Sequence, residues 1–501
     1  MKRQRLIGAS LFCGLLSTSA AYADVTSAQV WQNWKDLSTG YGQKVTTTSE
    51  VQQGDTLVIT GMVIESVTPE VSLRGTLDEV RFRELGDGRV EVTMSPEYPI
   101  TVETVEGETT TKISISLIQN NLKMIADGTV DATSYEFTSD SISVQSTEVL
   151  ENGAPFPVAF SLVANGTGGS YLVTRRPADV IDLQSEFRAG DMQLTVKATD
   201  TEQGSDVDVS ASIAQIAVTS GGVFGAAMDP EQFSDALNAG FAVDLAMTYG
   251  AINYTVNVTD ATGPTTVKGK VDEGGLGFAV DKLKMAYKGG ARGVEVLLSG
   301  AQIPFPEVAL RYAETAFDFR LPMSKAEDEQ DFNLTMKVQD LTVSDEIWGL
   351  VDPGQQLSRE PATLVIESRG KALLTADLTD EEAMSSGTPP GELRSLNIPA
   401  LQLKIAGAEL TGSGAFTFDN TDLTSFDGMP APTGSLSLAL AGGDALLSKL
   451  TGLGLVPADQ AMSVRMMAGI FARPGPAPDT LTSTIEFKDK SLLINGSPMP
   501  F

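Results

Sequence analysis

The residue types that most often perform acid–base and metal chemistry are nearly missing from this sequence. Among its 501 residues there is no histidine and only one cysteine, Cys13. The lack of histidine excludes Ser-His-Asp triads, the common zinc sites and the usual proton shuttle near neutral pH. A mature chain without Cys13 would also have no thiolate nucleophile and no disulfide. Catalytic chemistry that needs histidine or a thiolate is therefore excluded.

A turn with alternating acids is the strongest candidate for a metal site. It holds Asp200, Glu202, Asp206 and Asp208. Hard cations such as Ca²⁺ bind several carboxylate oxygens, but this cluster has neither the EF-hand spacing nor its closing glutamate. A second acidic run, at residues 327–331, is typical of a solvated hairpin tip. We therefore predict no metal site in either cluster.

Paired carboxylates can cleave glycosides without histidine, which leaves a carboxylate-based hydrolase as a minor alternative. With 65 acidic residues in the chain, the sequence singles out no such pair. We predict that the protein is not an enzyme and that it has no catalytic residue and no cofactor.

The N-terminus has the three parts of a secretory signal peptide. The first five residues carry three positive charges, residues 6–16 are apolar, and residues 21–23 read Ala-Tyr-Ala. Phe12 stands before Cys13, where a lipoprotein signal needs a small residue. We expect cleavage before Asp24 and export to the periplasm, with residues 1–23 removed.

The chain is strongly acidic. Its 35 basic and 65 acidic residues give a net charge of −30, and removing the three positive charges of residues 1–23 leaves 32 against 65, or −33. Such a charge repels nucleic acid and anionic lipid headgroups. We therefore expect no nucleic acid among its partners.

Alternation of apolar and polar residues dominates the chain and predicts an all-β fold. The pattern is clear at residues 113–117, 192–199, 207–213, 254–258, 332–338 and 436–440. A strand of this kind buries one face and wets the other, as in antiparallel sheets. Turn pairs such as Asp87-Gly88 and Asn495-Gly496 separate the strands. We predict one or more large, twisted antiparallel sheets of some twenty or more short strands, partly curved over a helix.

Three regions carry helix signals. Ser27 is the predicted N-cap of a helix that runs to Gly40 and places Trp31 and Trp34 on one face. Asp229 before Pro230 predicts the start of a short helix near residues 230–240. A helical pair is expected within residues 444–472, with its bend at residues 453–455.

Domain boundaries are weakly marked. We expect an N-terminal β-rich half at residues 24–228 and a C-terminal β-rich half at residues 229–501. Residues 151–157 and 379–392 are rich in loop formers and could separate lobes. No repeat has a sharp period, and no segment after residue 23 has an uninterrupted apolar run of membrane length.

Several motifs resemble one bacterial family, the domain of unknown function 2125 family. At the C-terminal end these are residues 434–438, 446–447, 454–457, 487–489 and 492–496. In the middle they are residues 340–343, Trp348, residues 352–354 and residues 361–364. The opening block at residues 30–34, with residues 40–42 and 54–57, is also similar to the family.

The resemblance implies an exported periplasmic protein of Gram-negative bacteria with no established activity. It carries no catalytic residues over to this chain. Its sheet-rich pattern is reminiscent of AsmA-like envelope proteins, whose long curved sheets are thought to shield lipid, although fold alone does not determine function. The most family-like position is Trp348 beside Asp352-Pro353, which suits either a site or a tryptophan that anchors a turn.

Two functions follow from these patterns. The first is an envelope protein that binds or shields lipid in an apolar β-groove. The second is a structural or protein-interaction module with a filled core and no ligand. A continuous open face of Leu, Ile and Val side chains would favour the first, and a packed sandwich would favour the second.

Overall fold

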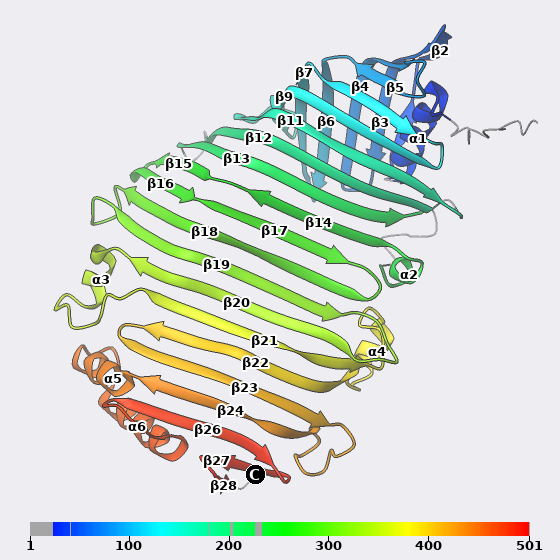
Figure 1. The fold of residues 1–501 in the computed structure, drawn as a ribbon. Coiled ribbons are helices and arrows are strands. Elements are labelled where there is room, and N and C mark those ends of the chain that lie inside the picture. Colours follow the sequence, from blue (N-terminus) through cyan, green and yellow to red (C-terminus); the bar gives the residue numbers. More distant parts are fainter. Residues whose placement is uncertain (1–23, 41, 179, 201–203, 226–232, 500–501) are drawn as a thin grey trace, which may run out of the picture.

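The computed structural model describes residues 24–499 apart from residues 41, 179, 201–203 and 226–232. Within these residues the chain forms one large antiparallel sheet of 28 strands and six short helices (Figure 1). The predicted all-β class is therefore confirmed.

The strands of the N-terminal part curl around a helix. They are β1 (Lys44–Thr46), β2 (Ser49–Gln53), β3 (Thr56–Val67), β4 (Val71–Glu84), β5 (Val90–Met94), β6 (Glu97–Glu106), β7 (Thr109–Asn120), β8 (Lys123–Gly128), β9 (Ala132–Glu151), β10 (Ala154–Pro155) and β11 (Val158–Arg176).

The middle of the sheet follows on from β11. They are β12 (Val180–Asp200), β13 (Ser205–Phe224), β14 (Ala242–Tyr249), β15 (Ile252–Asp260), β16 (Gly263–Val271), β17 (Glu273–Val280), β18 (Lys284–Gly300), β19 (Val308–Pro322) and β20 (Gln330–Val343).

The C-terminal part continues the same sheet. Its strands are β21 (Ala362–Leu374), β22 (Gly391–Ile405), β23 (Ala408–Asp419), β24 (Ala431–Ala441), β25 (Arg473–Pro474), β26 (Thr480–Lys488), β27 (Ser491–Ile494) and β28 (Ser497–Met499). The helices are α1 (Ser27–Gly40), α2 (Phe233–Asn238), α3 (Asp345–Val351), α4 (Glu381–Ser385), α5 (Gly443–Gly452) and α6 (Ala458–Phe471).

A line of irregular backbone crosses the sheet near the middle of the long strands. Residues with positive φ mark it in five strands, at Gly61, Gly166, Gln215, Gly293 and Asp340. Most pairings keep their register across this line, and the β20–β21 pairing shifts between Val338 and Leu341. β13 pairs with β15 before Gln215 and with β14 after it. As in a β-bulge, such a residue shifts the alternation of side chains by one position.

This shift keeps apolar residues on one face. In β3, Ile59 and Met62 lie on opposite sides of Gly61 and are three residues apart, yet both pack into the same core. In β13 the large apolar residues Val207, Val209 and Ile213 are odd-numbered, whereas Ile216, Val218 and Phe224, after Gln215, are even-numbered. The sheet therefore keeps one apolar face across the irregular line.

The main core lies at the N-terminal end, where α1 packs on this face. Trp31 and Trp34 of α1 contact the ring of Phe82, with ring centroids 5.9 and 5.2 Å apart. Around them lie buried residues of β3, β4, β5, β8, β9, β11 and β12. The predicted helix and the common face of its two tryptophans are confirmed.

The predicted cap of α1 is wrong by one residue. The Gln29 backbone N–H donates to Thr26 Oγ1, and the Thr26 backbone N–H donates to Gln29 Oε1, which is a capping box. Ser27 instead donates its hydroxyl proton to Glu84 Oε1 of β4. Its side chain therefore joins the helix to the sheet and does not cap the helix.

The other helix predictions have mixed outcomes. The helical pair near residues 444–472 is confirmed as α5 and α6. α2 lies in the predicted region, but Asp229 and Pro230 fall outside the described residues. Of the two loop-rich segments, residues 151–157 hold the turn from β9 to β11, and residues 379–392 contain α4. None of the described helices has the length and apolarity needed to span a membrane.

The division into two halves near residue 229 stays a prediction. β13, before that point, hydrogen-bonds to β14 and β15 after it. The signal peptide predicted at residues 1–23 lies outside the described residues.

Candidate functional site

One face of the sheet is apolar along most of its length. Residues directly opposite each other on neighbouring antiparallel strands point to the same face. Following such pairs from β3 to β24 gives one row of apolar residues and glycines, which we call the central apolar row: Leu57, Phe82, Val92, Met124, Phe137, Gly169, Phe187, Val218, Met247, Leu276, Gly289, Phe317, Met336, Ile366, Leu401, Gly412 and Leu438. Its sixteen steps of about 4.8 Å give a length of roughly 75 Å.

A second row lies beyond the irregular line. It contains Tyr98, Leu117, Val144, Leu162, Leu194, Ala211, Tyr254, Gly269, Val296, Leu310 and Val343, each paired directly with the next. Because the backbone shift keeps apolar residues on one side, both rows belong to a single face. We call it the apolar face.

The opposite face is polar. The row next to the central apolar row reads Ser170, Glu186, Thr219, Ala246, Gly277, Lys288, Asp318, Thr335 and Glu367. Paired charges on this face form ion pairs, such as Arg311 Nε with Glu295 Oε1 at 2.5 Å. The two faces therefore have different chemistry, as expected for a sheet with one wetted face.

Beyond α1, the described part of the chain places no second layer on the apolar face. The strands contact mainly their hydrogen-bonded neighbours, and α5 packs against β23. Large apolar side chains on this face remain exposed: Leu245 by 38%, Leu403 by 43% and Met336 by 48%. The apolar face is therefore open.

The total accessible surface supports this conclusion. It is 29377 Å², whereas a compact chain of 52.8 kDa exposes about 18,000 Å². A fully exposed stretch as long as residues 1–23 would explain only about 3,500 Å² of the difference. Most of the excess surface therefore belongs to the sheet.

Aromatic rings lie flat against glycines on the apolar face. Tyr254 pairs with Gly269 and Phe317 pairs with Gly289. A methyl group at Gly289 would come within 2.8 Å of the Phe317 ring, and one at Gly269 would overlap the Tyr254 ring. Because glycine has no side chain, the neighbouring ring can cover the backbone. At these positions the surface of the apolar face is flat and consists partly of the faces of aromatic rings.

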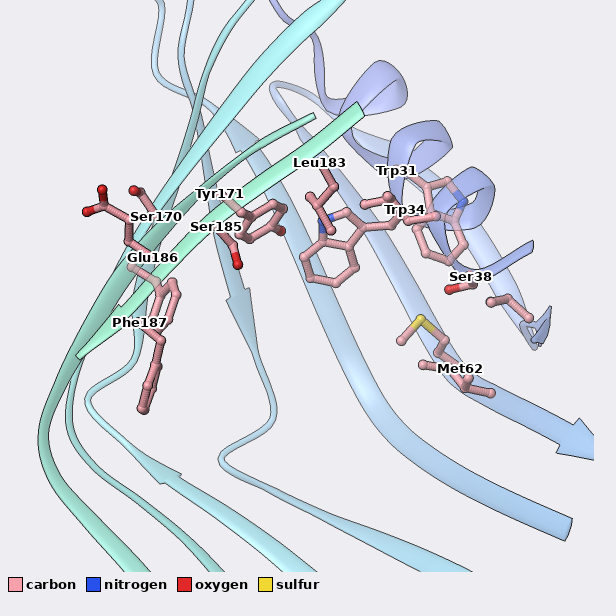
Figure 2. Close-up of a pocket in the computed structure, with 14 residues that line it drawn as sticks. Trp31, Trp34, Ser38, Met62, Ser170, Tyr171, Leu183, Ser185, Glu186 and Phe187 are labelled. Carbon is pink, nitrogen blue, oxygen red and sulfur yellow. The ribbon is translucent and has the colours of Figure 1, made fainter. Parts of the chain in front are cut away.

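A pocket of about 500 Å³ lies where α1 meets the open part of the apolar face. Figure 2 shows Trp34 projecting from α1 toward Tyr171 and Leu183 of the sheet. Met62, Phe137 and Phe187 also line the pocket. Phe137 and Phe187 are members of the central apolar row, so the pocket opens onto that row.

A polar cluster supports the pocket from below α1. The buried Asn33 donates from Nδ2 to Thr133 Oγ1 at 2.9 Å and accepts at Oδ1 from Arg175 Nη2 at 2.7 Å. Arg175 also pairs with Asp36. This charge is therefore neutralised on the helix side and does not face the pocket.

Tyr171, which lines the pocket, and Tyr135, which stacks against it, are neutral phenols. The rings of Tyr135 and Tyr171 stack with centroids 4.3 Å apart. Burial raises the pKa of Tyr135 to about 12, and burial together with Tyr135 raises the pKa of Tyr171 further. Neither phenol ionises near neutral pH. The lining is mainly apolar and aromatic, and its polar members are three serines and Glu186.

The acidic residues that were considered as metal ligands contact neighbouring side chains. Asp206 accepts a hydrogen bond from Thr199 Oγ1 at 2.7 Å, and Asp208 Oδ2 lies 3.6 Å from Lys197 Nζ. Glu202 falls outside the described residues. The run at residues 327–331 covers the end of the β19–β20 connection and the start of β20. Among the residues that the structure describes, no group of three or more ligand-type side chains could hold a metal ion.

The region around Trp348 is a turn that side-chain contacts hold in place. Asp352 is fully buried, and its carboxylate accepts the backbone N–H groups of Gln356 and Leu357 at 2.9 and 2.8 Å. The Arg359 guanidinium lies 4.8 Å from the Trp348 ring centroid and 3.6 Å from Asp352 Oδ2. Trp348 is only partly buried. These contacts explain the motif as an anchor for the α3–β21 connection.

The apolar face itself could not be read from the sequence as one site. Alternation showed that each strand has an apolar side, but the line of positive φ residues determines how these sides join. The pairs of aromatic residue and glycine are visible only in the strand register.

Comparison with known proteins identifies one family. Residues 252–499 match the model of a family described as an uncharacterized protein conserved in bacteria, DUF2125. This range contains the middle and C-terminal motifs, for which the resemblance is confirmed, while the opening block at residues 30–57 lies outside it. No curated protein and no solved structure is similar enough to count as a match.

Proposed function

We propose that this protein, whose residues 252–499 belong to the DUF2125 family, binds the acyl chains of lipids along its apolar face and shields them from water in the periplasm. The observation that carries the proposal is the continuity of the central apolar row, which runs for roughly 75 Å. Its first three members, Leu57, Phe82 and Val92, are buried in the core beneath α1, and the row continues from there onto the open part of the apolar face. Exposed apolar areas of this extent mark binding surfaces.

The shape of the apolar face favours flexible chains over a second protein layer. Packed sheets interdigitate side chains that stand up from each face. Here the rings of Tyr254 and Phe317 cover glycines and flatten the surface. Acyl chains are flexible, so they can adapt to a flat apolar surface of ring faces and methyl groups.

The pocket beside α1 and the distribution of charge are both compatible with lipid acyl chains as the ligand. The pocket of about 500 Å³ beside α1 falls within the usual size range of ligand pockets and continues the apolar face. The two apolar rows contain no charged residue. A net charge of −30 repels anionic headgroups, so we expect neutral or zwitterionic lipids to bind best.

The test is lipid extraction from protein purified from its host without detergent. Organic extraction and mass spectrometry should find phospholipid in at least equimolar amount. The variant Met336→Glu places a carboxylate on the central apolar row at a position already 48% exposed. Because burying a carboxylate against hydrocarbon is unfavourable, this variant should lose most of the bound lipid.

The matched control is Thr335→Glu, which adds the same charge to the same strand on the polar face. It should retain lipid at the wild-type level. If the wild-type protein is lipid-free and stable, lipid binding is refuted and the alternative of a structural or protein-interaction module takes its place. Equal loss of lipid in both variants would also contradict the proposal, because the effect would not depend on the face.

A further inference from the structure

Helix α6 exposes apolar side chains at a place that the apolar face does not include. The six exposed residues are Met462 (71%), Val464 (53%), Met466 (65%), Met467 (53%), Ile470 (53%) and Phe471 (39%). They cluster within fourteen residues, unlike the scattered apolar residues that every protein surface carries. A cluster of this kind marks a contact surface.

Contacts on the side of α6 that faces the rest of the protein fix the orientation of this helix. Ala461 is buried, and Arg465 Nε donates to Asp444 Oδ1 of α5 at 2.6 Å. At its C-terminal end the Phe471 carbonyl oxygen accepts from Ser483 Oγ and Asn495 Nδ2. At 100° per residue, Met466 and Ile470 lie roughly opposite Ala461. The methionine-rich side therefore points away from α5.

We propose that this outward side of α6 docks onto the surface of a zwitterionic lipid bilayer. Its charge supports that choice, because Arg465 is paired with Asp444 and the remaining charged residue of the helix is Asp459 in its first turn. A surface with no free positive charge, on a protein of net charge −30, does not attract anionic headgroups. Helices that lie in the interface plane insert one apolar side to a shallow depth.

The size of the surface favours a bilayer over a protein partner. A helix of fourteen residues is about 21 Å long and about 10 Å wide, so one side presents roughly 200 Å². A stable protein interface needs about 800 Å² on each partner. Methionine side chains are flexible and fit irregular apolar surroundings such as lipid.

The test is flotation of the purified full-length protein with phosphatidylcholine vesicles. Wild-type protein should float with the vesicles, and adding phosphatidylglycerol should reduce the bound fraction. The double variant Met462→Glu/Met466→Glu should bind at least tenfold more weakly. The matched control is Met429→Glu, at an exposed position (61%) in the β23–β24 connection, which should bind like the wild type.

A direct readout is Met466→Trp, whose emission should be quenched by brominated phosphatidylcholine. Failure of the wild type to float, or equal flotation of the double variant, would overturn the proposal. The inference is separate from acyl-chain binding, because the double variant should still yield extracted lipid at the wild-type level.

Discussion

At the scale of single residues, glycine determines the smoothness of the apolar face. Gly269 is buried beneath the ring of Tyr254, its direct partner on β15. Glycine in a strand normally weakens it, since it has no side chain to pack and loses more entropy on folding. Here the neighbouring ring supplies the missing contact, so the position requires glycine for a packing reason.

We predict that Gly269→Ala destabilises the protein by about 1–3 kcal/mol, because the new methyl group and the Tyr254 ring cannot occupy the same space. Urea unfolding measures the change. In a Tyr254→Ala background the same substitution should have little effect. An equal loss in both backgrounds would mean that the ring is not the obstacle.

At the scale of elements, the helices divide into those that cover the sheet and those that only border it. α1 covers the N-terminal end of the apolar face, while α3 and α4 sit in connections between strands (Figure 1). α3 is held by Asp352, whose backbone N–H donates to the Trp348 carbonyl oxygen. The connection depends on this one buried carboxylate.

The charge of Asp352 makes that anchor pH-dependent. Burial alone would raise its pKa, but the N–H groups of Gln356 and Leu357 and the nearby Arg359 charge outweigh it, so the pKa lies below the ordinary 3.8. A lowered folded-state pKa adds stability above the unfolded value and loses it as the pH falls through the folded value. The ion therefore stabilises α3 at neutral pH.

We predict that Asp352→Asn lowers the midpoint of thermal unfolding at pH 7, because an amide oxygen replaces the charged acceptor of two N–H groups. The difference from the wild type should start to shrink as the pH falls below about 3.8, the value of the unfolded chain, and should continue to shrink as the pH falls through the lower pKa of the folded state. A difference that stays constant down to pH 2 would show that charge plays no part. Differential scanning calorimetry across this range is the measurement.

At the scale of the whole molecule, a single-layer sheet makes the protein elongated and rich in exposed surface. A compact chain of 476 residues, the length of residues 24–499, would have a radius of gyration of about 23 Å. We predict a value clearly above this in small-angle X-ray scattering of the lipid-free protein. A value near 23 Å would mean that the sheet folds over its own apolar face in solution, and would count against an open binding surface.

The sequence by itself determined the fold class and the chemistry that the protein lacks. Alternation in segments such as residues 192–199 and 207–213 predicts half-buried strands, since side-chain direction in a strand has a period of two. The absence of histidine excludes whole classes of active site. The tryptophan pair of α1 and the helical pair α5–α6 were also predictable, because their apolar residues recur at helical spacing.

Only the tertiary structure decided how these strand faces join and what remains uncovered. Alternation within one strand cannot reveal the neighbour's register, and the change of phase at Gln215 depends on a backbone angle that glutamine rarely adopts. The cap of α1 moved from Ser27 to Thr26 because the Glu84 carboxylate, distant in sequence, accepts from Ser27. The open apolar face is a property of strand pairing across the whole sheet, and local sequence carries no direct record of it.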